Sequence, residues 1–155
     1  ILLSILRERK KCKGVGVDIS KNAIKLAKYN AKIQHIKNRI RFLNSDIDNF
    51  YGDKYDLIIS NPPYVKLHKI NSLDKDIKSF EPKVALNGGV DGYTKIRLTI
   101  KKSSILIKKR GKLFLEVGFD QTRETLKLLK LNGFYTNKVV KDLANVNRCL
   151  VSTKI

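Results

Sequence analysis

The stretch Asp56-Leu57-Ile58-Ile59-Ser60-Asn61-Pro62-Pro63-Tyr64 decides the fold and indicates where a ligand binds. Leu57 to Ile59 form an apolar run, which predicts a strand that is buried on both faces. The two prolines have no N–H to donate to a ladder, so the chain must leave the sheet at Asn61. Ligands of open α/β sheets bind beyond the carboxyl ends of the strands. The rigid corner offers the Asn61 amide and the Tyr64 ring, which suit a planar group that carries an NH2.

The length and composition predict one globular domain over residues 1–155, because 155 residues with 42% hydrophobic content can bury a sizeable core. No apolar run reaches the length of about 18 residues that a membrane span needs, and no signal-peptide pattern is present. We therefore expect a cytoplasmic protein without a membrane partner. Cys12 and Cys149 lack the spacing of metal ligands, so we expect reduced thiols and no metal site.

The formal charge of +19 permits two interpretations. It fits a polyanionic partner such as DNA, RNA or the ribosome. It also fits a Lys-rich coding bias, because the lysines are scattered along nearly every predicted element. The charge alone does not decide between them.

Strands and helices alternate along the chain, which predicts an α/β fold with a doubly wound, mostly parallel sheet. Ser20 and Asp120 are predicted helix N-caps, and Ala23, Ala27 and Ala31 are predicted to form one small helix face. Residues 65–91 are expected to be long and irregular. The predicted helices cover residues 1–11, 21–32, 92–109 and 121–131, and the predicted strands cover residues 14–18, 39–43, 55–60, 113–117, 134–140 and 148–153, the last two antiparallel.

An acid or an amide recurs at three predicted strand ends, at Asp18, Asp46 and Asn61. A carboxylate at the position of Asp18 can accept hydrogen bonds from both hydroxyls of a ribose, or it can be a solvent-exposed acid. Asp46 can accept the amino group of an adenine or cap a turn. His35 and His68 lie in Lys-rich, polar surroundings and are predicted to be surface residues.

The corner resembles motif IV of the S-adenosylmethionine-dependent methyltransferases that act on planar amino groups. Asn-Pro-Pro-Tyr alone is shared by DNA and RNA amino-methyltransferases and by glutamine methyltransferases. Four further segments resemble the HemK-type peptide chain release factor glutamine methyltransferases in the same order, so the likeness covers essentially the whole chain. These segments are Phe80–Leu86, Gly89–Gly92, Leu115–Gln121 and Asp142–Arg148.

The resemblance implies a Rossmann-like methyltransferase sheet whose last strand pair is antiparallel. The implied activity is methyl transfer from S-adenosylmethionine to the side-chain amide nitrogen of glutamine in the Gly-Gly-Gln motif of peptide chain release factors. The implied cofactor-binding residues are Asp18 at the ribose, Asp46 and Ile47 at the adenine, and Asn61. The family commonly has an aromatic residue where Ile47 stands. The implied catalytic and substrate-binding residues are Asn61, Pro62, Pro63 and Tyr64.

The family's first strand, glycine-rich cofactor loop and N-terminal helical domain would precede Ile1. The sequence contains no Met, so we expect an N-terminally truncated fragment. Two other functions stay open. One is a DNA or RNA amino-methyltransferase that acts on adenine or cytosine, and the other is an inactive remnant or a basic RNA-binding module. If the protein methylates release factors, we expect it to contact nucleic acid only indirectly, through the ribosome.

We predict that the 155-residue chain by itself binds S-adenosylmethionine weakly or not at all, because the glycine-rich loop expected under the methionine moiety is missing from the sequence. Isothermal titration calorimetry measures this affinity. A dissociation constant in the low micromolar range for this chain would contradict the prediction.

Overall fold

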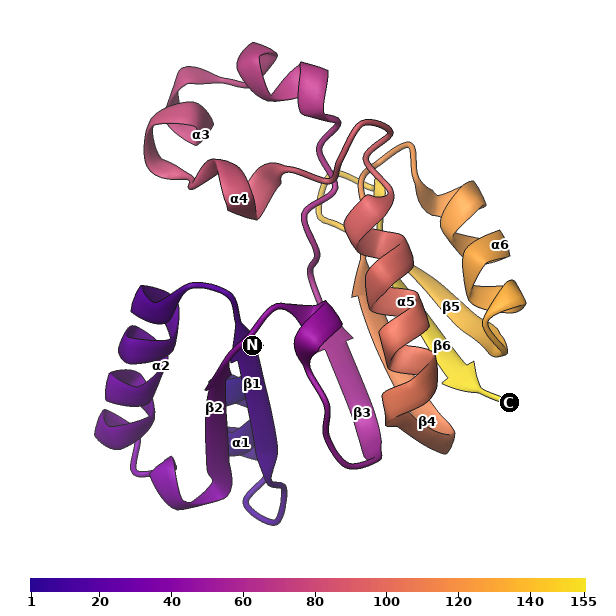
Figure 1. Cartoon of the computed structure of the whole chain (residues 1–155). Helices are drawn as coiled ribbons and strands as arrows, with labels where there is room; N and C mark the ends of the chain where they lie inside the picture. The colour runs from indigo at the N-terminus through magenta and orange to yellow at the C-terminus, as the bar shows by residue number, and fades with distance from the viewer. The chain divides into compact units, whose positions relative to one another are not determined.

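The structure, a computed structural model, describes all 155 residues and shows helices and strands that alternate along most of the chain (Figure 1). Three short 3-10 helices, η1 Lys37–Arg39, η2 Ile47–Asn49 and η3 Leu67–Ser72, lie in the connections. The regular elements are α1 Leu2–Glu8, β1 Gly14–Asp18, α2 Lys21–Ile33, β2 Ile40–Asn44, β3 Tyr55–Ser60, α3 Lys75–Phe80, α4 Lys83–Leu86, α5 Thr94–Leu106, β4 Ile107–Glu116, α6 Thr122–Leu131, β5 Phe134–Lys141 and β6 Asn147–Lys154.

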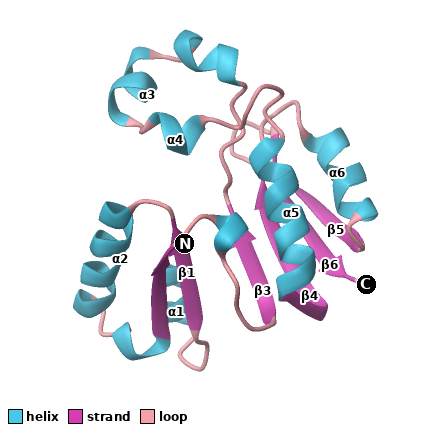
Figure 2. Ribbon diagram, in the orientation of Figure 1, coloured by secondary structure: helices cyan, strands magenta, loops and turns pink.

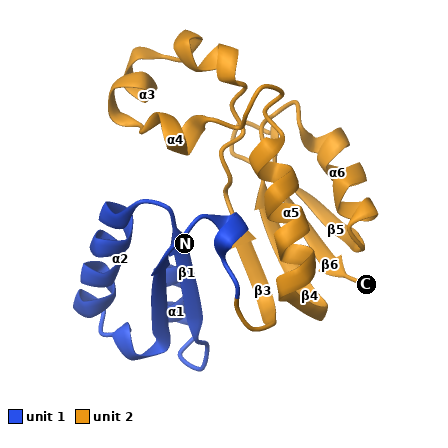
Figure 3. Cartoon of the chain, in the orientation of Figure 1, with its two compact units in different colours: residues 1–51 blue, residues 52–155 orange.

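The chain divides into two compact units, Ile1–Tyr51 and Gly52–Ile155 (Figure 3). The first unit contains a two-stranded sheet, β1-β2, and the second contains a four-stranded sheet of order β3-β4-β6-β5. The assignment of residues 1–155 to a single domain stays a prediction. None of the helices combines the length and the apolar character that crossing a membrane requires.

In the first unit, β1 pairs with β2 in parallel, and α2 follows β1. The Ser20 hydroxyl accepts a hydrogen bond from the Ala23 N–H at 3.2 Å, which confirms the predicted N-cap. Ala31 is buried, but Ala23 is exposed, so the predicted small face is wrong at that position. The inward face of α2 instead contains the buried Ile24 and Ala31 and the half-buried Ala27. Successive helix positions turn by about 100°, and Ala23 lies outside this face.

In the second unit, β3 and β4 are parallel, whereas β6 runs antiparallel to both β4 and β5. The predicted antiparallel last pair is therefore confirmed, and β6 is the only strand of this sheet that opposes the others. Helices α5 and α6 pack on one face of the sheet (Figure 1). The core on this face contains Ile96, Ile100, Leu113, Leu115, Leu129 and Leu150, all completely buried.

The strand before the corner is less buried than its sequence predicted. Leu57 and Ile59 are 42% and 36% exposed, so burial on both faces is wrong for β3. Ile58 pairs with the buried Leu113 on the face that the helices cover, and its two neighbours therefore point to the other face. As an edge strand, β3 also has β4 as its only ladder partner.

Three other sequence expectations need correction. The helix predicted for residues 92–109 is α5, which ends at Leu106, and Ile107 already begins β4. Asp120 is not an N-cap, since Gln121 occupies that position before α6 without a side-chain cap bond. Residues 65–91 contain η3, α3 and α4 and are not structureless; Figure 2 shows these helices beyond the end of β3.

Candidate functional site

The predicted corner directly follows the carboxyl end of β3, which ends at Ser60. Pro62 is buried, which anchors the turn, while Asn61 is exposed. Tyr64 is half-buried and packs against the hydrophobic core of the second unit. The Asn61 side chain makes no hydrogen bond within the chain. Its amide oxygen and NH2 are therefore both available to a ligand.

A buried amide, that of Gln121, holds the backbone behind the corner. Gln121 is 2% exposed. Its Oε1 accepts a hydrogen bond from the Gly118 N–H at 2.9 Å, and its Nε2 donates to the carbonyl oxygens of Tyr64 at 3.1 Å and Gly92 at 3.0 Å. One side chain thus ties together the corner, the loop before α5 and the turn after β4. Buried amides require such partners, because an unpaired polar atom costs free energy.

The loop before α5 approaches the corner so closely that two of its positions require glycine. A Cβ on Gly88 would lie 2.7 Å from the Tyr64 Cα, and one on Gly92 would lie 2.8 Å from the Tyr64 oxygen. Gly92 also has a φ of 80°, which favours glycine. Backbone hydrogen bonds complete the support, from the Val65 N–H to the Leu86 oxygen at 3.0 Å and from the Gly88 N–H to the Val65 oxygen at 2.8 Å.

Asp91 fixes the start of α5. Its carboxylate accepts two hydrogen bonds from the Arg97 guanidinium, at 2.9 and 3.1 Å, and one from the Tyr93 N–H at 2.9 Å. The hydrogen bond from Arg97 is the main reason why the pKa of Asp91 lies below its usual value. A charged Asp91 therefore orders the segment that contains Gly92.

Asp142 closes the loop between β5 and β6. Its Oδ1 accepts hydrogen bonds from the N–H groups of Ala144 at 2.9 Å and Val146 at 3.0 Å, and its Oδ2 accepts from Arg148 Nε at 3.1 Å. The Val146 N–H is the main cause that lowers the pKa of Asp142, and Arg148 adds to the effect. Arg148 Nη1 also donates to the Val117 oxygen at 3.3 Å, which ties this loop to the residue after β4.

The predicted cofactor residues of the first unit lie at the carboxyl ends of its two strands. Asp18 ends β1, is exposed, and its Oδ1 accepts a hydrogen bond from the Ser20 N–H at 2.8 Å. The Ser45 N–H donates to the Asp18 carbonyl oxygen at 3.1 Å, which brings the chain after β2 beside the end of β1. Asp46 caps η2 by accepting from the Asp48 N–H, and Ile47 is half-buried.

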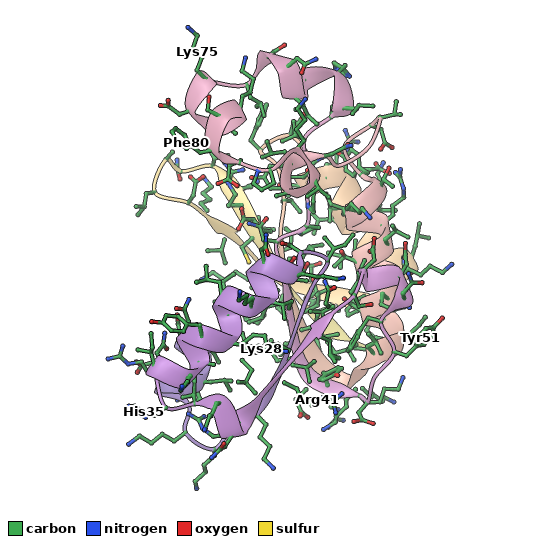
Figure 4. All side chains as sticks on the ribbon, turned by 60° about the vertical axis from the view of Figure 1, so that its left-hand side comes forward. Lys28, His35, Arg41, Tyr51, Lys75 and Phe80 are labelled. Carbon is green, nitrogen blue, oxygen red and sulfur yellow. The ribbon has the colours of Figure 1, made fainter.

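The structure therefore collects the candidate residues in two groups, Asp18, Asp46 and Ile47 in the first unit and the corner in the second. The ligand roles of both groups stay predictions. Gln121 was not predicted to support the corner. The sequence signal for this role is a glutamine three residues after Gly118, which itself follows an apolar strand. His35 and His68 are exposed, as predicted, and His35 lies beyond the end of α2 (Figure 4). No group of three or more His, Cys, Asp or Glu side chains is placed to hold a metal ion.

Sequence comparison relates the chain to methyltransferases. Residues 1–78 match the family model described as "Methyltransferase small domain". The chain is 34% identical over 155 residues to the release factor glutamine methyltransferase of Caulobacter vibrioides, covering 99% of this chain and 54% of that relative. It is 38% identical over 140 residues to the protein of the same name from Thermodesulfovibrio yellowstonii, covering 90% of this chain and 50% of that relative. The chain thus spans about half the length of these curated relatives.

Structural comparison supports the fold. A crystal structure of a methyltransferase from Pyrococcus furiosus aligns with a TM-score of 0.70 at 14% identity, covering 99% of this chain and 68% of that one. At such low identity the likeness concerns the fold alone. It confirms the predicted α/β methyltransferase architecture.

We predict that Gln121→Leu destabilises the second unit by about 1–3 kcal/mol, because it removes the partners of a buried N–H and two carbonyls at similar side-chain volume. Urea denaturation followed by circular dichroism measures the loss. The matched control is Gln34→Leu, which changes an exposed side chain and should stay within about 0.5 kcal/mol of the wild type. Equal effects of the two substitutions would contradict a supporting role of Gln121.

We predict that the stabilisation by Asp142 depends on pH in the acidic range. Since the folded chain lowers the pKa of this carboxyl below its ordinary value of 3.8, its contribution is complete at neutral pH and is lost as the pH falls through the lowered value. Asp142→Asn should therefore be less stable than the wild type at pH 7, and the difference should shrink below pH 3.8. Denaturation midpoints measured between neutral and strongly acidic pH provide the test, and a difference that does not change with pH would contradict it.

Proposed function

The chain belongs to the methyltransferase small domain family, and from this premise we propose that the protein methylates a glutamine side-chain amide of a peptide chain release factor. The proposed acceptor is the glutamine of the Gly-Gly-Gln motif, and the proposed methyl donor is S-adenosylmethionine. The single observation that carries the proposal concerns the Asn61 amide, which follows the carboxyl end of β3. This amide is exposed and makes no hydrogen bond within the chain. The names of relatives that are 34% and 38% identical support the choice of substrate.

The first unit offers groups that fit the nucleoside part of the proposed cofactor. Asp18 is exposed and uses its Oδ1 to bind the Ser20 N–H, so its Oδ2 is available to ribose hydroxyls. Asp46 and Ile47 lie after the neighbouring strand, where they would contact the adenine. Ile47 can provide an apolar surface for the base, although it lacks the ring that is common at this position in the family.

The second unit would bind and orient the substrate amide. S-adenosylmethionine, when bound, supplies the activated methyl group. An amide nitrogen is a poor nucleophile because its lone pair is delocalised into the carbonyl. In our proposal, the Asn61 side-chain oxygen and the Pro62 carbonyl each accept one N–H of the glutamine NH2. These two bonds favour pyramidalisation and direct the lone pair, and such alignment can lower the barrier by several kcal/mol.

The surroundings of the corner suit this orienting role. Tyr64 is half-buried, so the accessible part of its ring can pack on the planar amide while its backbone stays fixed by Gln121. No strong base is required before the transfer, because the nitrogen loses its proton after it has become cationic. Rigid positioning is therefore the main contribution of the corner. In this proposal residues 1–155 act as one methyltransferase domain, with Asp18, Asp46 and Ile47 binding the cofactor and the corner binding the substrate.

A nucleic-acid amino-methyltransferase is the second candidate. The same corner suits the exocyclic NH2 of adenine or cytosine, and the charge of +19 suits a polyanionic substrate. The release-factor proposal is favoured by the four further segments that resemble that family. An assay of the full-length protein with labelled cofactor, release factor, DNA and RNA separates the two candidates. Label that appears only on nucleic acid would refute the first.

We predict that Asn61→Ala in the full-length protein reduces methyl transfer to the release factor by at least about a hundredfold, because one acceptor that orients the NH2 is lost. The affinity for S-adenosylmethionine should change by less than about tenfold, since the nucleoside contacts of Asp18 and Asp46 are retained. Labelled methyl transfer and calorimetry measure the two quantities. The control is His68→Ala, which changes a nearby exposed side chain and should retain activity. Full activity of Asn61→Ala would remove Asn61 from its proposed role.

A further inference from the structure

The second unit has a hollow at the end of its sheet opposite the corner. The corner lies at the carboxyl end of β3, whereas the hollow lies where β4 and β5 begin and β6 ends. Its volume is about 470 Å³. Eight residues line it, Lys109, Arg110, Lys112, Tyr135, Asn137, Thr153, Lys154 and Ile155.

Three cationic side chains, those of Lys109, Arg110 and Lys112, line the hollow, and none of its lining residues is Asp or Glu. All three come from one segment of β4, residues 109–112, while β6 and the edge strand β5 add polar and aromatic residues to the lining. Some other cations of the second unit are paired with acids, as in Lys108–Asp56, Lys127–Glu124 and Arg148–Asp142. None of the three cations of the hollow forms an ion pair. Within one hollow their fields add, because the Debye length at physiological salt is about 8 Å.

An irregularity in β4 presents two of these cations. The parallel register with β3 jumps from the pair Tyr55–Ile107 to the pair Leu57–Lys112, so β4 contains three residues more than its partner at this point. Lys109 and Arg110 lie on this excursion and are exposed. Arg110 has a φ of 65°, an uncommon conformation for a residue with a side chain.

The third cation is held by neutral groups. Lys112 Nζ donates to the Thr153 hydroxyl at 2.6 Å, and Thr153 in turn donates to Asn137 Oδ1. These bonds fix the position of the Lys112 ammonium group without neutralising its charge. Lys154 also borders the hollow, but its Nζ lies 5.2 Å from the centre of the buried Phe134 ring, so its ammonium group lies on the face that the helices cover. The hollow therefore offers three cations to an anion.

An exposed aromatic ring, that of Tyr135, lies beside Thr153 and Lys112 across neighbouring strands of the sheet. Tyr135 pairs with Thr153, and Thr153 pairs with Lys112, so the three side chains point to one face. Tyr135 is 62% exposed. A flat ring beside a positively charged groove is typical of surfaces that bind single-stranded nucleic acid, since bases stack on the ring while cations contact phosphates. An acidic peptide would use the cations but not the ring.

We propose that this hollow binds the phosphodiester backbone of a single-stranded nucleic acid, with one base stacked on Tyr135. Lys109, Arg110 and Lys112 contact phosphates, and Asn137 and Thr153 offer polar contacts to the sugar or base. The site is separate from the proposed methyl-transfer corner, so it does not depend on that function. It also differs from a uniform effect of the +19 charge, because it requires specific residues.

Fluorescence anisotropy with the 155-residue chain tests the proposal. The probes are labelled oligonucleotides of about 12 nucleotides, oligo-uridine RNA and oligo-thymidine DNA, since one binding fold typically covers about 4–16 nucleotides. The affinity should fall as the salt concentration rises, with a slope of log K against log salt of about −2, as expected for three phosphate contacts on a single strand. The RNA and DNA arms show whether the sugar matters. Binding of either probe with this slope supports the site.

Two pairs of variants locate the binding. Lys109→Ala with Arg110→Ala should weaken binding by at least about tenfold and reduce the salt slope by about two thirds. The matched control, Lys28→Ala with Lys32→Ala on α2, removes the same charge from exposed positions and should change binding by less than about threefold. Tyr135→Ala should weaken binding by about tenfold, whereas Tyr135→Phe, which keeps the ring, should bind like the wild type. All four variants change exposed side chains, and circular dichroism verifies their folding.

Three results would overturn the proposal. The first is that the double variant in the hollow and the double variant on α2 weaken oligonucleotide binding equally, which would mean that overall charge alone drives binding. The second is an unchanged affinity of Tyr135→Ala, which would remove the stacked base. The third is displacement of the oligonucleotide by poly-glutamate at equal charge concentration, which would identify an acidic protein as the partner.

Discussion

The buried amide of Gln121 is the interaction on which the proposed substrate corner depends. Its three hydrogen bonds join the backbone at Tyr64, Gly92 and Gly118, which lie far apart in the sequence. Each partner is a backbone group without a helix or strand ladder to satisfy it, so the loss of the amide would leave polar groups unpaired in the interior. The glycines at positions 88 and 92 allow the close approach that the bridge requires.

The two ends of β4 have different chemical characters. At the carboxyl end, neutral amides, glycines and a half-buried tyrosine shape the corner. At the amino end, unpaired cations and an exposed tyrosine surround a hollow. The proposed positioning of a neutral glutamine amide would require rigid hydrogen-bond acceptors, whereas the proposed attraction of a polyanion would require uncompensated charge. One sheet could combine the two proposed roles because its strands hold the two ends apart.

Much of the candidate site could be predicted from local patterns. Asp18, Asp46 and Asn61 were placed at or just after strand ends, because an apolar run followed by a polar residue and a turn or helix signal marks the end of a strand. The support of the corner could not be predicted in this way. A glutamine before a helix reads as a surface residue, and only its burial against Tyr64 and Gly92 reveals its role.

The sequence by itself determined the elements whose signals are local, such as β1, β3, the Ser20 cap and the antiparallel pairing of the last two strands. Tertiary structure alone decided that β6 lies between β4 and β5, that Ile107 belongs to a strand, and that Leu57 and Ile59 remain exposed. The reason is that hydrophobic periodicity reports how a segment is patterned. The side on which a strand finds its partner, and whether a layer covers its second face, depend on contacts between residues distant in the chain.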